Sequence, residues 1–377
     1  MSRTPGRMAI PTQPSSYAWE ATNEAIAERY GVPIERVARF DTNTAPAPPE
    51  IVHQILAAGR FVVPVSEYPP GDYGELVRAA AARYGVGTDE ILVGAGADEI
   101  LDLVTKAFLP PGGSAVVPTP TYPMFGVLTD QRPAHLVRVP RRGADEAFAV
   151  DANAVRDAAR TADLVWLCSP NNPTGRAERT GVIDDLLETI AADAERDHRP
   201  APTVVVDEAY AEFNALSNLE LRTAYPRLVL VRTMSKAYGI AGLRVGFAVA
   251  QPDVIGLMAP YRPPGSVSVA SVTVATRLLQ EPGLVSANVA RTIAERARLS
   301  EALAAEGWAV QPSETNFLLV SFASRERAGE VADGLLQRGL VPRTFGSDHP
   351  LSNCLRVTVR NVEQDDRLIE AAREIGG

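Results

Sequence analysis

The sequence contains very little cysteine, and its two cysteines lie far apart. Cys168 and Cys354 are the only ones among 377 residues, and neither has a second cysteine or a histidine at the spacing of a metal-ligand pair. Such a pattern supports neither a disulfide framework nor a zinc site. We therefore expect a protein without disulfides and without a bound metal.

The chain also lacks an excess of positive charge and any long apolar run. Lysine and arginine total 37 against 46 acidic residues, a net charge of −9, and no basic cluster is present, so nucleic acid is not an expected partner. The longest apolar runs, such as residues 164–168, have the length of a strand and fall far short of the ~20 residues of a membrane helix. Residues 1–14 are polar and lack the apolar core of a secretory signal. The sequence thus predicts a cytoplasmic protein with no membrane segment.

What the sequence does contain is a regular alternation of short apolar runs and helical patterns between residues 73 and 250. Runs that are apolar throughout are typical of parallel strands buried on both faces by helices. We therefore predict an α/β fold, with a three-layer, mostly parallel sheet and a smaller α+β domain at the C-terminal end. The expected strands are 91–93, 114–117, 136–139, 164–168, 203–206, 228–231 and 245–250, and the expected helices include 73–84 and 99–108.

The length of the chain suits one large domain plus a smaller one. Residues 1–49 are expected to form an N-terminal arm or part of the small domain, with a helix at 20–29 and an extended, proline-rich passage at 41–49. Residues 50–264 are expected to form the large domain, which ends in a proline-rich break. Residues 265–377 are expected to form the small domain, and its predicted elements are a helical pattern at 269–306 with a break at 282–283, strands at 316–321 and 355–359, and a helix at 328–338.

Polar residues follow several of the predicted buried strands directly. Ligands of open α/β sheets collect at the carboxyl ends of the strands, so these junctions are the first candidates for a site. The first, Gly94-Ala95-Gly96-Ala97-Asp98-Glu99, follows a strand and opens a helix, which suits a phosphate group, although a tight turn capped by Asp98 would look the same. Glu99 stands where a dinucleotide-binding motif needs its third glycine, which disfavours a nicotinamide site.

Two further junctions carry groups suited to a carbonyl cofactor. Lys236 can form a Schiff base when its pKa is depressed, and its neighbours Thr233, Ser235 and Arg244 suit one phosphate. Asp207 ends a buried strand, where it either caps a turn or neutralises a buried cation such as the protonated ring nitrogen of pyridoxal 5'-phosphate (PLP).

Two other polar residues are placed where they could reach the phenolic oxygen of PLP. Tyr210 follows Asp207 by three residues, and Asn172 lies in the junction after strand 164–168. Each also has an ordinary structural interpretation, because Asn172-Pro173 suits a turn and a tyrosine suits core packing.

Four sequence motifs together resemble the fold-type I PLP enzymes of the class I/II aminotransferase family, and within it the histidinol-phosphate aminotransferases. The resemblance extends from about Asp41 to the C-terminus. The motifs are Ser-Pro-Asn-Asn-Pro-Thr-Gly at 169–175, Val-Asp-Glu-Ala-Tyr at 206–210, Thr-Met-Ser-Lys-Ala-Tyr-Gly-Ile-Ala-Gly-Leu-Arg-Val-Gly-Phe at 233–247 and Leu-Arg-Val-Thr-Val at 355–359.

The resemblance implies a role for each matching residue of the cofactor site. Lys236 would be the Schiff-base lysine, Asp207 the partner of the pyridine nitrogen, and Asn172 and Tyr210 the partners of the phenolate oxygen. Tyr122 matches the aromatic residue that stacks on the ring. The phosphate cup matches Ala97, Asp98, Thr233, Ser235 and Arg244. Tyr68 matches a tyrosine that reaches the phosphate of the partner subunit's cofactor, which implies a homodimer with shared active sites.

The resemblance also implies a substrate site. Arg356 matches the arginine that binds the carboxylate of amino and keto acids, Arg343 matches a second arginine of the histidinol-phosphate group, and Asn43 lies in the N-terminal loop near the substrate. A surface ion pair is the alternative interpretation of either arginine. Two departures from the family concern the substrate, namely Gly265-Ser266 where an aromatic residue and an amide are common, and Arg360 where a glycine is common.

The expected function is a ping-pong transfer of an amino group from a small-molecule amine donor, with L-histidinol phosphate as the first candidate, to a keto acid acceptor, 2-oxoglutarate. An aromatic amino acid aminotransferase is one alternative. A PLP lyase similar to the threonine-phosphate decarboxylases is a second, because those enzymes share the cofactor motifs. A non-catalytic α/β binding protein is a third, and it would leave Lys236, Asp207 and Arg244 to chance.

Overall fold

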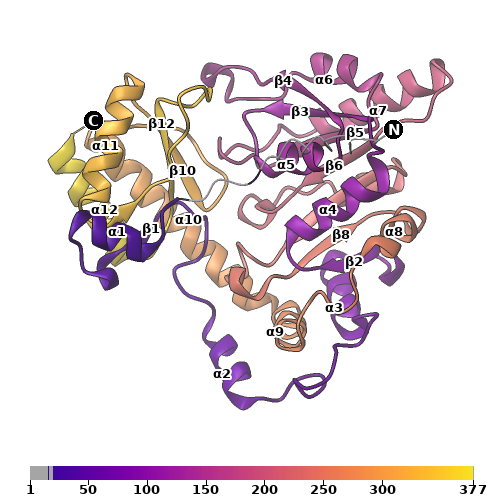
Figure 1. Ribbon diagram of the computed structural model, residues 1–377, viewed down its shortest axis with the longest axis horizontal. Helices are drawn as coiled ribbons and strands as arrows, with labels where there is room; N and C mark the ends of the chain where they lie inside the picture. Colours follow the sequence, from indigo (N-terminus) through magenta and orange to yellow (C-terminus); the bar gives the residue numbers. More distant parts are fainter. Residues whose placement is uncertain (1–15, 17–19, 377) are drawn as a thin grey trace, which may run out of the picture.

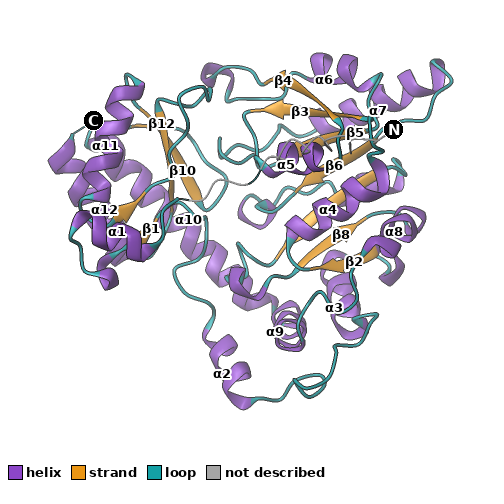
Figure 2. Cartoon of the chain, in the orientation of Figure 1, coloured by secondary structure: helices purple, strands orange, loops and turns teal. Residues whose placement is uncertain are grey.

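The computed structural model describes residue 16 and residues 20–376, and these residues form two parts that lie side by side (Figure 1). The larger part contains a seven-stranded sheet, and the smaller part contains α1 (Asn23–Tyr30) together with the C-terminal end of the described chain (Figure 2). The sequence predicts that residues 1–14 are not a secretory signal, and this segment lies outside the described residues.

The seven-stranded sheet confirms the predicted mostly parallel architecture. Its strand order is β2-β8-β7-β6-β5-β3-β4, and only β8 runs antiparallel to its neighbours. The strands are β2 (Ile91–Gly94), β3 (Ser114–Thr119), β4 (His135–Pro140), β5 (Leu164–Cys168), β6 (Thr203–Asp207), β7 (Leu228–Thr233) and β8 (Gly246–Val249).

Helices cover both faces of this sheet because its central strands are apolar on both sides. In β5, Trp166 and Cys168 pack into one hydrophobic core, and Val165 and Leu167 pack into the other, as the two-residue period of a strand requires. One core is completed by α3 (Gly74–Tyr84), α6 (Ala152–Ala159), α7 (Val182–Arg196) and α9 (Val269–Gln280). The other is completed by α4 (Ala97–Phe108), α5 (Met124–Gln131) and α8 (Pro252–Met258).

The smaller part has the predicted α+β character. Strands β9 (Ala309–Val310), β10 (Phe317–Ser321) and β12 (Cys354–Thr358) form an antiparallel sheet, and β1 (Ala38–Arg39) pairs in parallel with β11 (Leu340–Val341). A separate hydrophobic core therefore includes Ala38 and Phe40 from the N-terminal region. The helices of this part are α1 (Asn23–Tyr30), α10 (Pro282–Ala305), α11 (Arg325–Leu336) and α12 (Val362–Ile375). The predicted domain boundaries remain predictions. Helix α9, which was expected to belong to the small domain, packs into the core of the larger sheet.

Two features of the N-terminal region differ from the sequence prediction. The helix expected at 20–29 begins only at Asn23, because the Thr22 side chain accepts a hydrogen bond from the N–H of Ala25 and caps the helix there. A second helix, α2 (Glu50–Ala58), follows the proline-rich passage, and its buried Val52 packs into the core that α9 completes (Figure 1). Among residue 16 and residues 20–376, no helix is long and apolar enough to cross a membrane.

Candidate functional site

A cavity of about 610 Å³ lies at the carboxyl ends of β5, β6 and β7, where the smaller part meets the larger sheet. All the residues predicted for the site except Tyr68 line this cavity. They are Asn43, Ala97, Asp98, Tyr122, Asn172, Asp207, Tyr210, Thr233, Ser235, Lys236, Arg244, Arg343 and Arg356. The parallel sheet thus brings together residues that are up to 313 positions apart in the sequence, from 43 to 356.

The start of α4 forms one end of the cavity. Gly96 precedes the helix with φ of +84°, and a Cβ atom at this position would lie 2.5 Å from Nη2 of Arg244. Only glycine allows the backbone and the guanidinium to approach so closely. Arg244 Nη2 lies 3.0 Å from Asp98 Oδ2, and the Tyr122 hydroxyl donates a hydrogen bond of 2.9 Å to Asp98 Oδ1. The first-turn N–H groups of α4, together with Arg244, make this end suitable for an anion.

Two hydroxyl groups from the end of β7 complete this anion site. The Thr233 hydroxyl donates a hydrogen bond of 3.0 Å to Ser235 Oγ, and it accepts one from the Ser235 N–H at 3.2 Å. Both side chains are buried and line the cavity. Their mutual contacts hold two polar groups in the cavity that Ala97 and Asp98 of α4 also line, and the phosphate cup stays a prediction.

Asp207 and Lys236 lie in the buried middle of the cavity. Burial raises the pKa of Asp207 to about 7, although the Ala209 N–H donates a hydrogen bond of 3.0 Å to its Oδ1. Burial and the nearby Arg356 guanidinium lower the pKa of Lys236 to about 8. A buried carboxylate favours a cationic partner, and a lysine with a lowered pKa is a nucleophile at moderate pH. Lys236 Nζ donates to the backbone oxygen of Thr42 at 3.5 Å.

Tyr210 and Asn43 form a buried hydrogen-bond network beside Lys236. The Asn43 side-chain amide donates a hydrogen bond of 2.9 Å to the Tyr210 hydroxyl. The Thr358 hydroxyl accepts from the Asn43 N–H at 2.9 Å and fixes the loop to β12. Burial raises the pKa of Tyr210, so its hydroxyl stays protonated and can donate a hydrogen bond.

Two arginines stand side by side at the other end of the cavity. Arg343 and Arg356 face each other in an isolated antiparallel bridge, in which each N–H donates to the other's backbone oxygen at 3.0 Å. Residues paired in this way project their side chains from the same face of the sheet. The Arg356 guanidinium donates to Asn172 Oδ1 at 2.6 Å and to the backbone oxygen of Asp41. This end of the cavity therefore suits a carboxylate or a phosphate.

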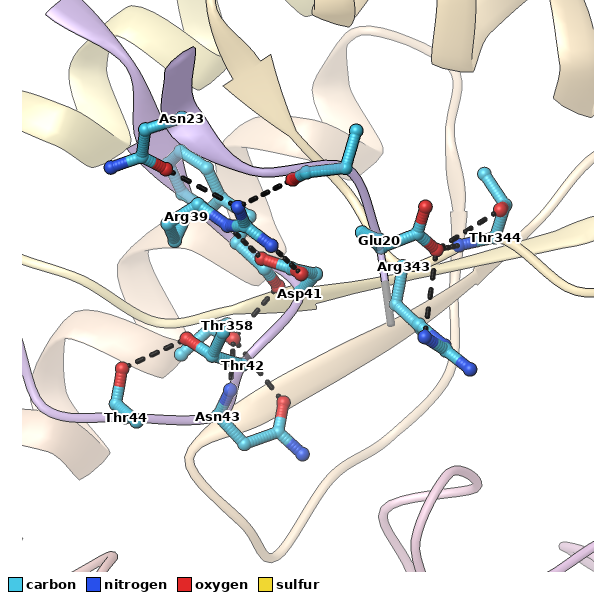
Figure 3. Close-up of polar contacts among 12 residues, drawn as sticks. Glu20, Asn23, Arg39, Asp41, Thr42, Asn43, Thr44, Arg343, Thr344 and Thr358 are labelled. Atoms are coloured by element: carbon cyan, nitrogen blue, oxygen red, sulfur yellow. Dashed lines mark hydrogen bonds and ion pairs between the residues drawn. The ribbon is translucent and has the colours of Figure 1, made fainter. Parts of the chain in front are cut away.

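Several residues of the cavity wall were not predicted from the sequence. Glu20 lies 3.6 Å from Arg343 through Oε1 and Nη1, in the segment that was expected to be helical (Figure 3). Asp41 and Thr42 contribute backbone oxygens to Arg356 and Lys236. Every residue has a backbone oxygen, so the sequence alone does not indicate which of them act as acceptors. The polar loop after the short strand β1, which contains Asn43, was nevertheless expected to lie near the site. Tyr68 lies outside the cavity of this chain and is 89% exposed.

The part of the chain that the structure describes contains no group of three or more histidine, cysteine or acidic residues that could hold a metal ion. Both cysteines are buried and unlinked.

Comparison with known proteins gives consistent matches along nearly the whole chain. Residues 38–371 match the family "Aminotransferase class I and II". The histidinol-phosphate aminotransferase of Roseiflexus castenholzii is 37% identical over 362 residues, which cover 93% of each chain. The histidinol-phosphate aminotransferase of Symbiobacterium thermophilum is 34% identical over 355 residues, which cover 91% of this chain and 94% of the relative. The crystal structure of histidinol-phosphate aminotransferase from Sinorhizobium meliloti in complex with pyridoxal-5'-phosphate has a TM-score of 0.84, with 25% identity and coverage of 95% of each chain.

The arrangement of the cavity fits PLP. An anion site at the start of α4 suits the phosphate, and the buried carboxyl of Asp207 suits a protonated ring nitrogen. Lys236, with its lowered pKa, suits a covalent link to a carbonyl carbon. On this fit and on the match over residues 38–371, the chain belongs to the class I and II aminotransferases, which are fold-type I, PLP-dependent enzymes.

Proposed function

We propose that this enzyme transfers an amino group from L-histidinol phosphate to 2-oxoglutarate in two half-reactions. The observation that carries the proposal is the pairing of Arg343 with Arg356 across one bridge, opposite the buried Lys236 in the same cavity. Two adjacent guanidinium groups suit the phosphate of the donor and the carboxylates of the acceptor in turn. The names of the relatives at 37% and 34% identity support the same donor.

The residues of the larger part would hold the cofactor. PLP supplies an electrophilic carbon for amines and a ring that withdraws electrons from the bonds next to the nitrogen. Lys236 would hold it covalently, and Asp207 would pair with its ring nitrogen. Asn172 and Tyr210 would donate hydrogen bonds to its ring oxygen, and Tyr122 would stack on the ring. The phosphate would lie among Ala97, Asp98, Thr233, Ser235 and Arg244.

Lys236 is the group in the described cavity that is best placed to move a proton during each half-reaction. Its Nζ lies 3.5 Å from the backbone oxygen of Thr42 and 5.8 Å from the centroid of the Tyr210 ring. A pKa of about 8 lets the amine accept and return a proton near neutral pH. Arg356 contributes to this low pKa and also marks the carboxylate end of the cavity, so both functions lie within one site.

We also propose that the enzyme acts in the cytoplasm as a homodimer with shared active sites. Tyr68 and Val65 lie in the connection between α2 and α3, and they are 89% and 72% exposed. Figure 1 shows this connection at the margin of the molecule, and neither residue lines the cavity. Large exposed apolar side chains in one segment are typical of an interaction surface. In the proposed dimer, Tyr68 would reach the phosphate of the cofactor in the partner.

A scan of amino donors tests the proposed substrate. Purified holoenzyme is mixed separately with histidinol phosphate, glutamate, phenylalanine, tyrosine and threonine phosphate, and the change in cofactor absorbance is followed in the absence of an acceptor. Conversion by histidinol phosphate and by glutamate supports the proposal. A preference for an aromatic amino acid would replace the donor and direct attention to Gly265 and Ser266. Release of carbon dioxide from threonine phosphate without any need for 2-oxoglutarate would replace the reaction type.

A further inference from the structure

The outer wall of the cavity contains a carboxylate beside the two arginines. Glu20 Oε1 lies 3.6 Å from Arg343 Nη1, which is an ion pair rather than a hydrogen bond (Figure 3). The same oxygen accepts hydrogen bonds from the Thr344 hydroxyl at 3.2 Å and from the Thr344 N–H at 3.4 Å. The side chains of Glu20 and Arg343 are 25% and 19% exposed. Three groups of one segment therefore hold the Glu20 carboxylate at the wall that Arg343 and Arg356 share.

The segment that carries Glu20 is fixed to the small part by Arg39. This guanidinium donates to the backbone oxygen of Ala21 at 2.8 Å and to Asn23 Oδ1 at 3.2 Å. It also makes a two-point ion pair with the Asp41 carboxylate, whose backbone oxygen accepts from Arg356. Because Asp41 compensates the charge of Arg39, the charge of Glu20 acts mainly on Arg343 and on whatever anion binds beside it. Figure 3 shows the two clusters adjacent to each other.

We propose that Glu20 is a specificity-determining residue that sets how strongly the arginine end of the cavity distinguishes a dianionic group from a monoanionic one. Arg343 and Arg356 lie opposite each other in a bridge, so their like charges repel and favour an anion between them. Glu20 supplies part of that negative charge from within the protein. Glu20 therefore lowers the affinity of the site for every anion. The loss of binding free energy is twice as large for a dianion as for a monoanion.

This inference rests on the proposed function, in which a substrate anion binds at Arg343 and Arg356. One half-reaction presents a phosphate dianion to these arginines, and the other presents carboxylates with one charge each. A pair of arginines without Glu20 would hold the phosphate much more tightly than a carboxylate. Glu20 brings the two affinities closer together, so that one site can serve both substrates.

The test measures two simple anions as competitive inhibitors of the donor half-reaction of the holoenzyme. Sulfate represents a permanent dianion and acetate a monoanion. The variant is Glu20→Gln, which keeps an oxygen to accept from Thr344 and removes the charge. The matched control is Glu24→Gln, which removes an equal charge from the first turn of α1 at a residue that does not line the cavity.

The expected effects follow from Coulomb's law. At a separation of roughly 6 Å and a water-like effective dielectric, loss of the Glu20 charge corresponds to about a threefold lower inhibition constant for acetate, and to about a tenfold lower one for sulfate. Glu24→Gln should change both constants by less than about twofold.

Equal changes for sulfate and acetate would overturn the proposal, as would changes no larger than those of the control. Weaker binding of both anions to the E20Q enzyme would also overturn it, because Glu20 would then act only by positioning Arg343. The anion constants can be measured with whichever donor reacts. Failure of histidinol phosphate as a donor would therefore refute the proposed substrate without affecting this test.

Discussion

Replacement of Asp207 by asparagine is expected to make the cofactor-free protein more stable while it weakens cofactor binding and catalysis. In the protein without cofactor, burial raises the pKa of this carboxyl from 3.8 to about 7. The folded state therefore binds the proton more tightly than the unfolded state does. As the pH rises from about 4 to about 7, the folded protein loses stability, and above pH 7 the full cost of the buried charge remains.

The magnitude follows from the size of the shift. A change of about three pKa units at 1.36 kcal/mol per unit gives a cost of about 4 kcal/mol at pH 8 and about 1.5 kcal/mol at pH 5. Asparagine has no such cost, and its oxygen can still accept the hydrogen bond from the Ala209 N–H. With an unfolding entropy of about 2.1 cal/mol/K per residue, the Asp207→Asn apoenzyme should melt roughly 5 °C higher than the wild type at pH 8 and roughly 2 °C higher at pH 5.

The assay is thermal unfolding of both apoenzymes, followed by circular dichroism at the two pH values. Asp193→Asn provides a control of opposite sign, because ion pairs with Arg156 and Arg196 lower the pKa of Asp193. That variant should be less stable than the wild type at neutral pH, and the difference should shrink as the pH falls. A shift for Asp207→Asn that is the same at pH 5 and pH 8, or a less stable apoenzyme, would refute the reasoning. With PLP bound, the order should reverse, since the carboxylate then pairs with the ring nitrogen.

Three further predictions concern the other functional groups. The rate at which the apoenzyme captures PLP should rise with pH and level off above about pH 8, because Lys236 reacts as the neutral amine. A capture rate that is independent of pH between about 6 and 9 would contradict this prediction. Arg356→Lys should raise the KM for 2-oxoglutarate roughly 10- to 100-fold, as measured by steady-state kinetics, since lysine cannot make the forked contact, while the cofactor affinity changes little. Lys236→Ala and Tyr68→Ala subunits that are refolded together should regain roughly one quarter of the wild-type active sites, as measured by titration of active centres. The reason is that each hybrid dimer has one intact site, which combines Lys236 of one subunit with Tyr68 of the other. No recovery would exclude a role for Tyr68 in the partner's site.

The central strands could be predicted from the sequence because a strand that is buried on both faces is an uninterrupted apolar run. Each of the five residues of β5 is buried, and the same holds for β6, and both strands contain an uninterrupted apolar run, at 164–168 and at 204–206. The strands that the sequence did not reveal, β1, β9 and β11, have two residues each. A two-residue strand is too short to show any period, and it exists only because another segment supplies its partner.

The cofactor end of the site was accessible to sequence reasoning for a related reason. Asp207 and Lys236 follow buried strands of one parallel sheet, and the carboxyl ends of such strands meet at one edge. The substrate end depends instead on how the small part packs against the large one. Glu20 lies beside Arg343 because Arg39 and Thr344 fix the N-terminal segment, and no local pattern in the sequence encodes these contacts.

The contacts of Arg356 explain why a substrate bound at one end of the cavity can affect the cofactor end. Its guanidinium donates to Asn172 Oδ1 at 2.6 Å, and Asn172 belongs to the larger part. A carboxylate accepts stronger hydrogen bonds than an amide oxygen does, so in the proposed complex an incoming substrate would compete with Asn172 for the same donor. The contact with Arg356 uses only Oδ1 of Asn172, which leaves its amide NH2 group to donate to the proposed ring oxygen of the cofactor. Lysine at position 356 would weaken the grip on the carboxylate without removing Asp207, Lys236 or the phosphate site, which is why the KM for the acceptor should change far more than the affinity for PLP.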